Sequence, residues 1–87
     1  MAIIPVLGTE DNDTLLGSSL GDTLNDNFII FGFEGDDIIQ GGDKEDALTG
    51  NEGNDFIIGL DGDDAITGNE GNDTIDGGDG TDVITGN

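Results

Sequence analysis

The sequence has no cysteine, no histidine and no arginine, and Lys44 is the only basic residue among its 87 residues. Without cysteine there is no disulfide to stabilise a small domain, and without histidine the usual zinc ligand and general base are missing. Tryptophan and tyrosine are also absent, which leaves four phenylalanines as the aromatic residues. A chain this short builds only a thin hydrophobic core, so we expect another source of stability.

Positive charge is nearly absent, and 21 acidic residues bring the formal net charge to -20. Self-repulsion of this size opposes folding, so we expect the chain to be disordered without counterions. One cation cannot neutralise phosphates or anionic lipids, which argues against nucleic-acid and membrane partners. The first seven residues carry no basic region and no run is long enough to cross a bilayer. We therefore expect no ordinary secretion signal and no membrane insertion.

A nine-residue repeat organises what is present. Four units run in unbroken register over residues 50–85: GNEGNDFII, GLDGDDAIT, GNEGNDTID and GGDGTDVIT. Each unit has Gly in its first and fourth places, Asp in the sixth and Ile in the eighth. Less regular units cover residues 8–16, 17–25, 32–40 and 41–49. A fixed short period of this kind is typical of a stack of similar turns joined by short strands.

Each constant place has a physical role. The aliphatic residue in the eighth place directs one side chain per strand into a shared core, and the glycines allow the positive φ angles of a tight turn. Turns stacked about 4.8 Å apart would align the sixth-place carboxylates in rows of like charge unless a hard cation lay between them. Oxygen ligands, flexible geometry and excess negative charge favour calcium over transition metals and magnesium.

The repeat resembles the nonapeptide G-G-x-G-x-D-x-U-x of the repeats-in-toxin (RTX) family. The resemblance covers residues 8–85 except residues 26–31. It implies an all-β fold, namely a right-handed parallel β-roll (β-solenoid) with two repeats per coil, turns on both sides, and calcium between turns two repeats apart. It also implies a ligand rule. One turn supplies the carbonyls of its second and fourth places and its Asp, and the later turn supplies the carbonyls of its first and third places and its Asp.

Applied to this sequence, the rule predicts a series of calcium sites. The first four are Phe33, Gly35 and Asp37 with Gly50, Glu52 and Asp55; Gly42, Lys44 and Asp46 with Gly59, Asp61 and Asp64; Asn51, Gly53 and Asp55 with Gly68, Glu70 and Asp73; and Leu60, Gly62 and Asp64 with Gly77, Asp79 and Asp82. A conditional fifth site is Ser18, Leu20 and Asp22 with Gly32, Glu34 and Asp37. The resemblance thus implies about four to five Ca²⁺ ions per chain, with further ions shared if chains assemble.

The segment at residues 26–31 (DNFIIF) breaks the register. The interval from Asp22 to Asp37 is 15 residues, which fits one repeat with six inserted residues or two repeats with three deleted. We favour the second interpretation, on which the fifth site depends, because residues 28–31 are strand-like and residues 25–27 suit a turn. Residues 1–7 are expected to form an N-terminal capping or edge strand on a roll spanning residues 8–87, since Pro5 suits an edge.

Other departures from the repeat concern side chains outside the core. Lys44 replaces the fourth-place glycine, so either its cation lies near the metal or it swings out to pair with a carboxylate. Ile38, Phe56 and Ile58 are expected to be exposed together, either as scattered apolar residues or as a packing patch, with Phe33 and Leu60 at turns. A threonine ladder is expected on the opposite sheet.

The carboxylates are explained by metal ligation, and no nucleophile or pocket signal remains, so we do not expect an enzyme. The sequence instead indicates a calcium-binding module, extracellular or at the cell surface, that folds on binding Ca²⁺ and has a structural or assembly role. One alternative is a subunit that self-assembles end to end into a calcium-dependent filament or matrix, because an uncovered roll end presents unpaired strand edges. Another is an accessory fragment of a secreted RTX enzyme or toxin.

Overall fold

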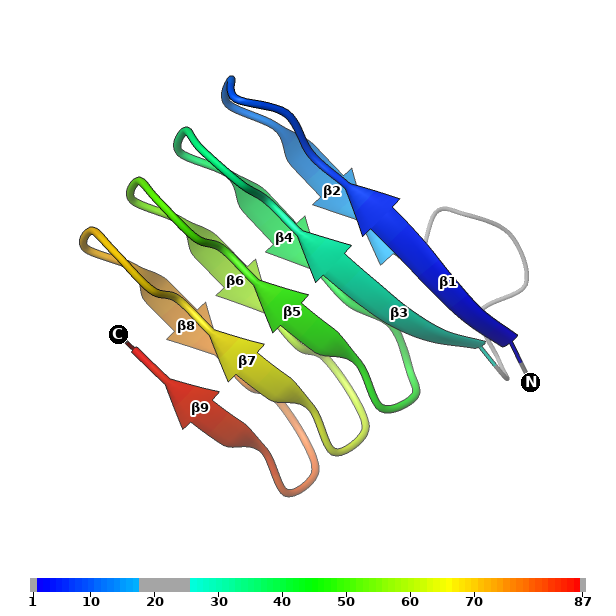
Figure 1. The fold of residues 1–87 in the computed structure, drawn as a ribbon. Coiled ribbons are helices and arrows are strands. Elements are labelled where there is room, and N and C mark those ends of the chain that lie inside the picture. The colour runs from blue at the N-terminus through cyan, green and yellow to red at the C-terminus, as the bar shows by residue number, and fades with distance from the viewer. Residues whose placement is uncertain (1, 18–25, 87) are drawn as a thin grey trace.

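The structure, a computed structural model, describes residues 2–17 and 26–86. These residues form parallel strands that lie in two sheets (Figure 1). The first sheet has the order β1 (Ala2–Leu7), β3 (Asp26–Phe31), β5 (Ala47–Thr49), β7 (Ala65–Thr67) and β9 (Val83–Thr85). The second has the order β2 (Thr14–Leu16), β4 (Ile38–Gln40), β6 (Phe56–Ile58) and β8 (Thr74–Asp76).

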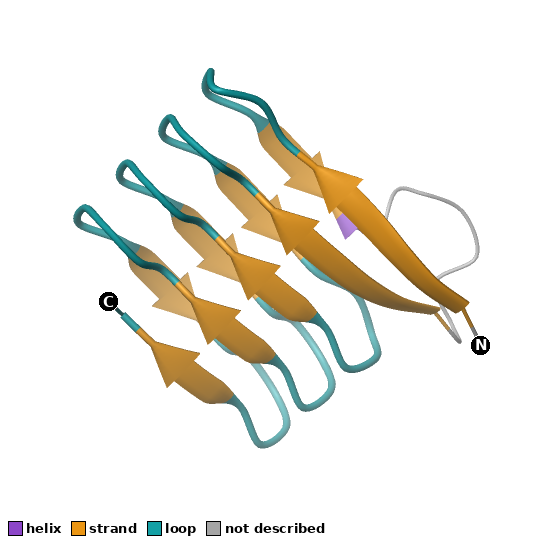
Figure 2. Cartoon of the chain, in the orientation of Figure 1, coloured by secondary structure: helices purple, strands orange, loops and turns teal. Residues whose placement is uncertain are grey.

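Consecutive strands alternate between the two sheets, so each coil contributes one strand to each face. Figure 2 shows that the loops are confined to two opposite sides of the stack, where they join one sheet to the other. Regular strand neighbours are two repeats apart, as in the pairing of Leu48 with Ile66 and of Ile39 with Ile57. The predicted fold class, an all-β parallel β-roll with two repeats per coil, is therefore confirmed.

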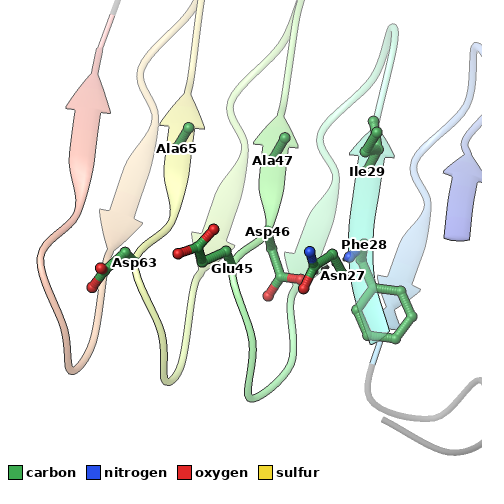
Figure 3. Close-up of a pocket in the computed structure, with 8 residues that line it drawn as sticks. All are labelled: Asn27, Phe28, Ile29, Glu45, Asp46, Ala47, Asp63 and Ala65. Carbon is green, nitrogen blue, oxygen red and sulfur yellow. Dashed lines mark hydrogen bonds between the residues drawn. The ribbon is translucent and has the colours of Figure 1, made fainter. Parts of the chain in front are cut away.

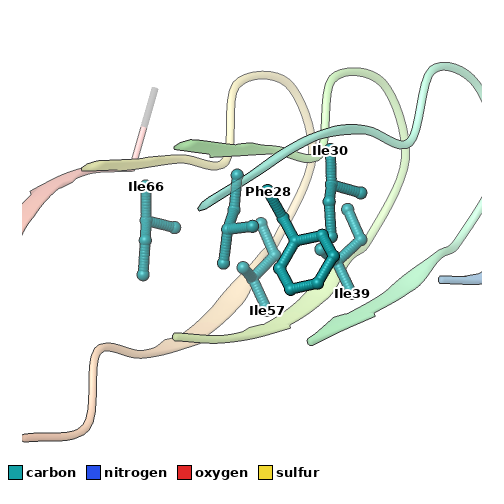
Figure 4. Close-up of a cluster of buried hydrophobic side chains, with 6 residues drawn as sticks. Phe28, Ile30, Ile39, Ile57 and Ile66 are labelled. Atoms are coloured by element: carbon teal, nitrogen blue, oxygen red, sulfur yellow. The ribbon is translucent and has the colours of Figure 1, made fainter. Parts of the chain in front are cut away.

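The core is a thin layer of side chains that extend from the two sheets toward each other (Figure 4). Its fully buried members are Phe28, Ile30, Ile39, Leu48, Ile57 and Ile66. Most of them occupy the eighth place of a repeat, where alternation along a three-residue strand points the middle side chain inward. Ile84 has the same place but is 49% exposed, because no described strand lies beyond β9 in its sheet. So slim a core supports the expectation that apolar burial alone does not stabilise the roll.

The winding through the irregular segment differs from the favoured interpretation. A shortened extra turn would put the strands at Leu15 and Ile39 in opposite sheets, yet β2 pairs with β4 in one sheet and Leu15 faces Ile39. Asp13 and Asp37, which are linked by a hydrogen bond between neighbouring turns, are 24 residues apart in the sequence. The same bond in the regular coils joins residues that are 18 apart. The coil therefore carries six additional residues, and the prediction of two repeats with three deleted is wrong.

The physical reason is the volume and apolarity of Phe28. Its backbone N–H donates to Asp46 Oδ1 at 2.8 Å, the same bond that sixth-place aspartates make elsewhere, so Phe28 occupies a sixth place and Ile30 an eighth. Both side chains are completely buried. Burying a phenylalanine and an isoleucine is favoured by about 1.5–3 kcal/mol for each side chain, which favours a winding that gives these two residues the inward-facing places. Leu24, the expected core residue, lies outside the described residues.

The strands carry the outward-facing side chains in rows. Ile38 pairs in register with Phe56, and both are exposed, at 44% and 42%. Thr49, Thr67 and Thr85 pair across β5, β7 and β9, which confirms the predicted ladder. β1 lies at the edge of its sheet and pairs along its whole length with β3. No helix among the described residues is long and apolar enough to cross a membrane.

Candidate metal centre

The turns form two rows, one on each side of the roll (Figure 1). Row 1 contains the turns at residues 8–13, 32–37, 50–55 and 68–73, which follow β1, β3, β5 and β7. Row 2 contains the described turns at residues 41–46, 59–64 and 77–82, which follow β4, β6 and β8. Each turn ends at the sixth place of its repeat, so an aspartate directly precedes β2 and each of the strands from β4 to β9. The only exception among the described strands that follow a turn is β3, where Phe28 has that place.

One oxygen of most sixth-place aspartates links neighbouring turns. In row 1, the backbone N–H of Asp37 donates to Asp55 Oδ1 at 2.8 Å, and the N–H of Asp55 donates to Asp73 Oδ1 at 2.9 Å. In row 2, the N–H of Asp46 donates to Asp64 Oδ1 and that of Asp64 to Asp82 Oδ1, both at 2.8 Å. The ladder places each carboxylate between its own turn and the preceding turn of its row.

The second oxygen of four of these aspartates is buried without a partner. Asp37, Asp55, Asp64 and Asp73 each have an Oδ2 atom that is inaccessible and accepts no hydrogen bond. Leaving one buried charged acceptor unsatisfied is costly, and here the same atom is unsatisfied in turn after turn. A cation between the turns would satisfy all of these oxygens. The donor set is entirely oxygen, which fits Ca²⁺.

Backbone carbonyls face the same space between the turns. A Cβ atom on Gly59 would lie 2.7 Å from the carbonyl oxygen of Gly77, and one on Gly62 would lie 2.7 Å from that of Lys44. The described residues contain no group of three or more acidic side chains that could hold a metal, so carbonyls are needed to complete any site. Glycine at these places lets the carbonyls of one turn approach the next.

The structure brings together the turns that the ligand rule had paired. The turn at residues 32–37 stacks on 50–55, and that turn stacks on 68–73. The turn at residues 59–64 stacks on 77–82. In these turns the second and fourth places have positive φ angles, as at Phe33 (67°) and Gly35 (102°). This repeated left-handed conformation at alternate residues turns successive peptide groups in opposite directions, as a carbonyl-lined site requires.

The turn at residues 41–46 is different. Neither Gly42 nor Lys44 is among the residues with positive φ, and Asp46 Oδ2 accepts a hydrogen bond from the Gly42 N–H at 2.8 Å. Figure 3 shows Asp46 beside Asn27 and Phe28, at the place where the preceding turn of row 2 would present an aspartate. Lys44 is exposed, and the part of the chain that the structure describes shows no ion pair to it. The predicted site of Gly42, Lys44 and Asp46 with the turn at 59–64 therefore lacks the geometry of the others on one side.

The conditional fifth site is not supported by the pairing of the turns. Ser18, Leu20 and Asp22 lie outside the described residues. The turn that stacks on 32–37 is instead 8–13, since the Asp13 N–H donates to Asp37 Oδ1 and a Cβ on Gly35 would lie 2.6 Å from the Asp11 carbonyl oxygen. Sequence reasoning missed Thr9, Asp11 and Asp13 as partners of this turn. The signal was available, because residues 8–16 match the repeat, but the wrong winding assigned the partner to the next unit.

Burial changes the acidity of the aspartates. Desolvation raises the pKa of Asp55 to about 6 and that of Asp64 to about 7, and it also raises the pKa values of Asp37 and Asp46. Hydrogen bonds from backbone N–H groups oppose this shift, and the neighbouring aspartates of the same row reinforce it. The carboxylates are thus costly to keep charged in a roll without metal.

These shifts predict how pH acts on the metal-free chain. Folded-state pKa values above the unfolded value mean that the roll binds more protons than the unfolded chain between about pH 4 and pH 7. Its stability therefore rises as pH falls through this window and is lost as pH rises. In calcium-free buffer we expect more β-structure by far-ultraviolet circular dichroism at about pH 5 than at about pH 8. The opposite order would contradict the assignment of buried, unpaired carboxylates.

Comparison with known proteins agrees with this geometry. The family model for the RTX calcium-binding nonapeptide repeat (4 copies) matches residues 31–66 and 58–87, which together make up more than half of the chain. No curated protein and no solved structure matches significantly. The matched residues include the turns with unpartnered Oδ2 atoms.

Proposed function

We propose that this chain, which belongs to the family of RTX calcium-binding nonapeptide repeats, is a structural module that folds outside the cell when Ca²⁺ binds between its turns. The observation that carries the proposal is the set of buried Oδ2 atoms without partners, at Asp37, Asp55, Asp64 and Asp73. A metal-free roll must either leave these charges unsatisfied or protonate them. Calcium offers each of them a ligand position.

The proposed sites follow the stacking of the turns. The strongest candidates are the pairs 32–37 with 50–55, 50–55 with 68–73, and 59–64 with 77–82, in which an unpartnered carboxylate oxygen meets carbonyls at left-handed positions. The pair 8–13 with 32–37 replaces the conditional fifth site. There Asp13 Oδ2 already accepts the Thr9 N–H at 2.6 Å, so we expect weaker binding. In row 1, Asp37 and Asp55 each belong to two proposed sites, which makes binding along that row cooperative.

The extracellular location rests on the coupling of folding to metal. Because binding free energy is folding free energy in such a chain, it stays unfolded where free calcium is scarce and folds where calcium is plentiful. A catalytic role is not part of the proposal, since calcium ligation accounts for the repeated geometry of the carboxylates within the rows. End-to-end self-assembly into a filament or matrix stays a prediction.

A calcium titration followed by far-ultraviolet circular dichroism tests the proposal, with magnesium as the matched control. We expect a cooperative gain of β-structure with Ca²⁺ and little change with Mg²⁺, which demands octahedral geometry and gives up its water reluctantly. Light scattering on the same samples reports any change in association state. Full β-structure in strong chelator at low salt and neutral pH, or folding by magnesium alone, would refute the proposed function.

A further inference from the structure

An open cleft lies beside the end of β3 and the first turn that follows it. Its volume is about 430 Å³, and it is lined by Phe31, Phe33, Glu34, Asn51 and Glu52. The rings of Phe31 and Phe33 stack, with centroids 6.1 Å apart and planes inclined by 27°. Both rings are partly exposed, at 36% and 41%. The cleft therefore joins an aromatic wall to two exposed carboxylates.

The roll does not need aromatic side chains at either place. Phe31 pairs with Thr49, and the row continues with threonine, so a small polar residue suffices on this face. Asn51 and Asn69 occupy the place of Phe33 in the next turns of row 1, and their φ angles, 71° and 68°, match its 67°. A left-handed conformation is unfavourable for a bulky residue, whereas asparagine tolerates it. Two exposed rings at places that suit threonine and asparagine point to a role outside the core.

The carboxylates of the cleft are not needed as calcium ligands in the proposed sites. In the proposed calcium sites, Glu34 and Glu52 contribute backbone carbonyls, so their side chains extend from the turn without a metal to bind. Lys44, the only basic residue of the sequence, belongs to a turn of row 2, and the two rows of turns lie on opposite sides of the roll (Figure 1). The described residues show no ion pair to Glu34 or Glu52. An external cation is the complement that this cleft lacks.

We propose that the cleft binds an arginine side chain presented by a basic segment of a partner protein. A guanidinium group is planar, stacks on aromatic faces and pairs with carboxylates through its fork of N–H donors, which suits a wall of phenylalanines beside two glutamates. The net charge of -20 attracts any basic segment, and the aromatic wall selects arginine within it. The two phenylalanines and the two glutamates line the same cleft, so one arginine side chain can contact both kinds of residue.

The cleft is built from two stacked turns, 32–37 and 50–55, so it exists only when they are held together. This inference goes beyond the proposed function and depends on it only for assembly of the roll. We therefore expect binding of the basic segment to require Ca²⁺. A chain that folds in calcium but does not bind the probe would refute this inference alone.

The test uses the whole chain in saturating calcium at about physiological ionic strength, where weak surface attraction is screened. The probe is a blocked glycine peptide with two arginines, and its controls carry citrulline, a neutral isostere, or lysine. We expect the arginine peptide to bind about tenfold more tightly than the citrulline peptide by isothermal titration calorimetry, with lysine between them. Chelator should abolish binding.

Matched variants separate the cleft from general acidity. Phe31→Thr introduces the residue type of Thr49, which pairs with Phe31 in the first sheet. Phe56→Thr is the equivalent change in the second sheet, where Phe56 pairs with Thr74. We expect about a five- to tenfold loss of arginine-peptide affinity in Phe31→Thr and less than about a twofold change in Phe56→Thr. Circular dichroism in calcium verifies that both fold. Equal binding of the citrulline peptide, or equal losses in the two variants, would overturn the proposal.

Discussion

Replacing Gly53 with alanine is expected to lower the free energy of unfolding of the calcium-loaded roll by about 2 to 6 kcal/mol. The first contribution is backbone strain, because Gly53 has a φ of 108°, where side chains other than hydrogen are rarely accommodated. The second is a collision, because a Cβ at this place would meet the carbonyl group of Gly35 in the preceding turn of row 1. That carbonyl is a proposed calcium ligand, so the collision also displaces a ligand.

The measurement is the calcium midpoint of folding, followed by circular dichroism, together with chemical denaturation in saturating calcium. Gly86→Ala is the control, because a Cβ on Gly86 would have no atom within 4 Å. We expect that control to change stability by no more than about 0.5 kcal/mol. If Gly53→Ala folded at the same calcium concentration as the parent chain, the close stacking of fourth-place glycines on the preceding carbonyls would be wrong.

Replacing Asp64 with asparagine is expected to have opposite effects with and without calcium. Asparagine keeps an oxygen that can accept the N–H of Asp46, so the ladder survives, but the buried charge and its unpartnered Oδ2 are removed. The metal-free roll should become more stable at neutral pH, since burial raises the pKa of Asp64 to about 7 and the charged form is disfavoured. In calcium the same change removes a ligand of the site proposed in row 2, between the turns at residues 59–64 and 77–82.

We expect the calcium midpoint of folding to be at least about tenfold higher for the Asp64→Asn variant than for the parent chain. Asp63→Asn is the matched control, because it removes the same charge one residue away. Asp63 is exposed and its Oδ1 accepts the Thr81 N–H at 2.7 Å, and Asn54 makes the same bond to Asn72 in row 1. The control should shift the midpoint by less than about twofold. Equal shifts in the two variants would mean that general acidity, and not ligation by Asp64, explains the calcium response.

In the irregular coil, the nonapeptide motif predicted the wrong order of turns. Residues 17–25 keep the first-place Gly, the sixth-place Asp and the eighth-place Leu of the repeat, yet the pairing of β2 with β4 leaves no second turn of row 1 between residues 8–13 and 32–37. The deciding residues are Phe28 and Ile30, which are apolar enough to occupy the places that Asp and Leu hold in a regular repeat. A nonapeptide pattern indicates where turns form locally, but it does not predict which apolar side chains are buried together.

The turn at residues 41–46 shows the same limit on a smaller scale. The substitution of Lys44 for glycine was visible in the sequence, and it raised the question of whether this turn could keep the conformation of the others. Only the tertiary structure decides the outcome: Gly42 and Lys44 are not left-handed, and Asp46 Oδ2 accepts a hydrogen bond from the Gly42 N–H. The stacking of Phe31 on Phe33 was equally hidden, because it depends on the left-handed backbone conformation that Phe33 adopts at the start of the turn.

The sequence by itself determined the period, the all-oxygen chemistry and the fold class, because each nine-residue unit repeats the same local requirements: glycine for the turn, aspartate for the ligand and one aliphatic residue for the core. The tertiary structure alone decided which turn stacks on which across the irregular coil, which carboxylate oxygens lack a partner, and where two phenylalanines meet two glutamates. The stacking of the turns, and the approach of Glu52 to the two phenylalanines, depend on contacts between residues 18 or more positions apart, where packing volume competes with local preference.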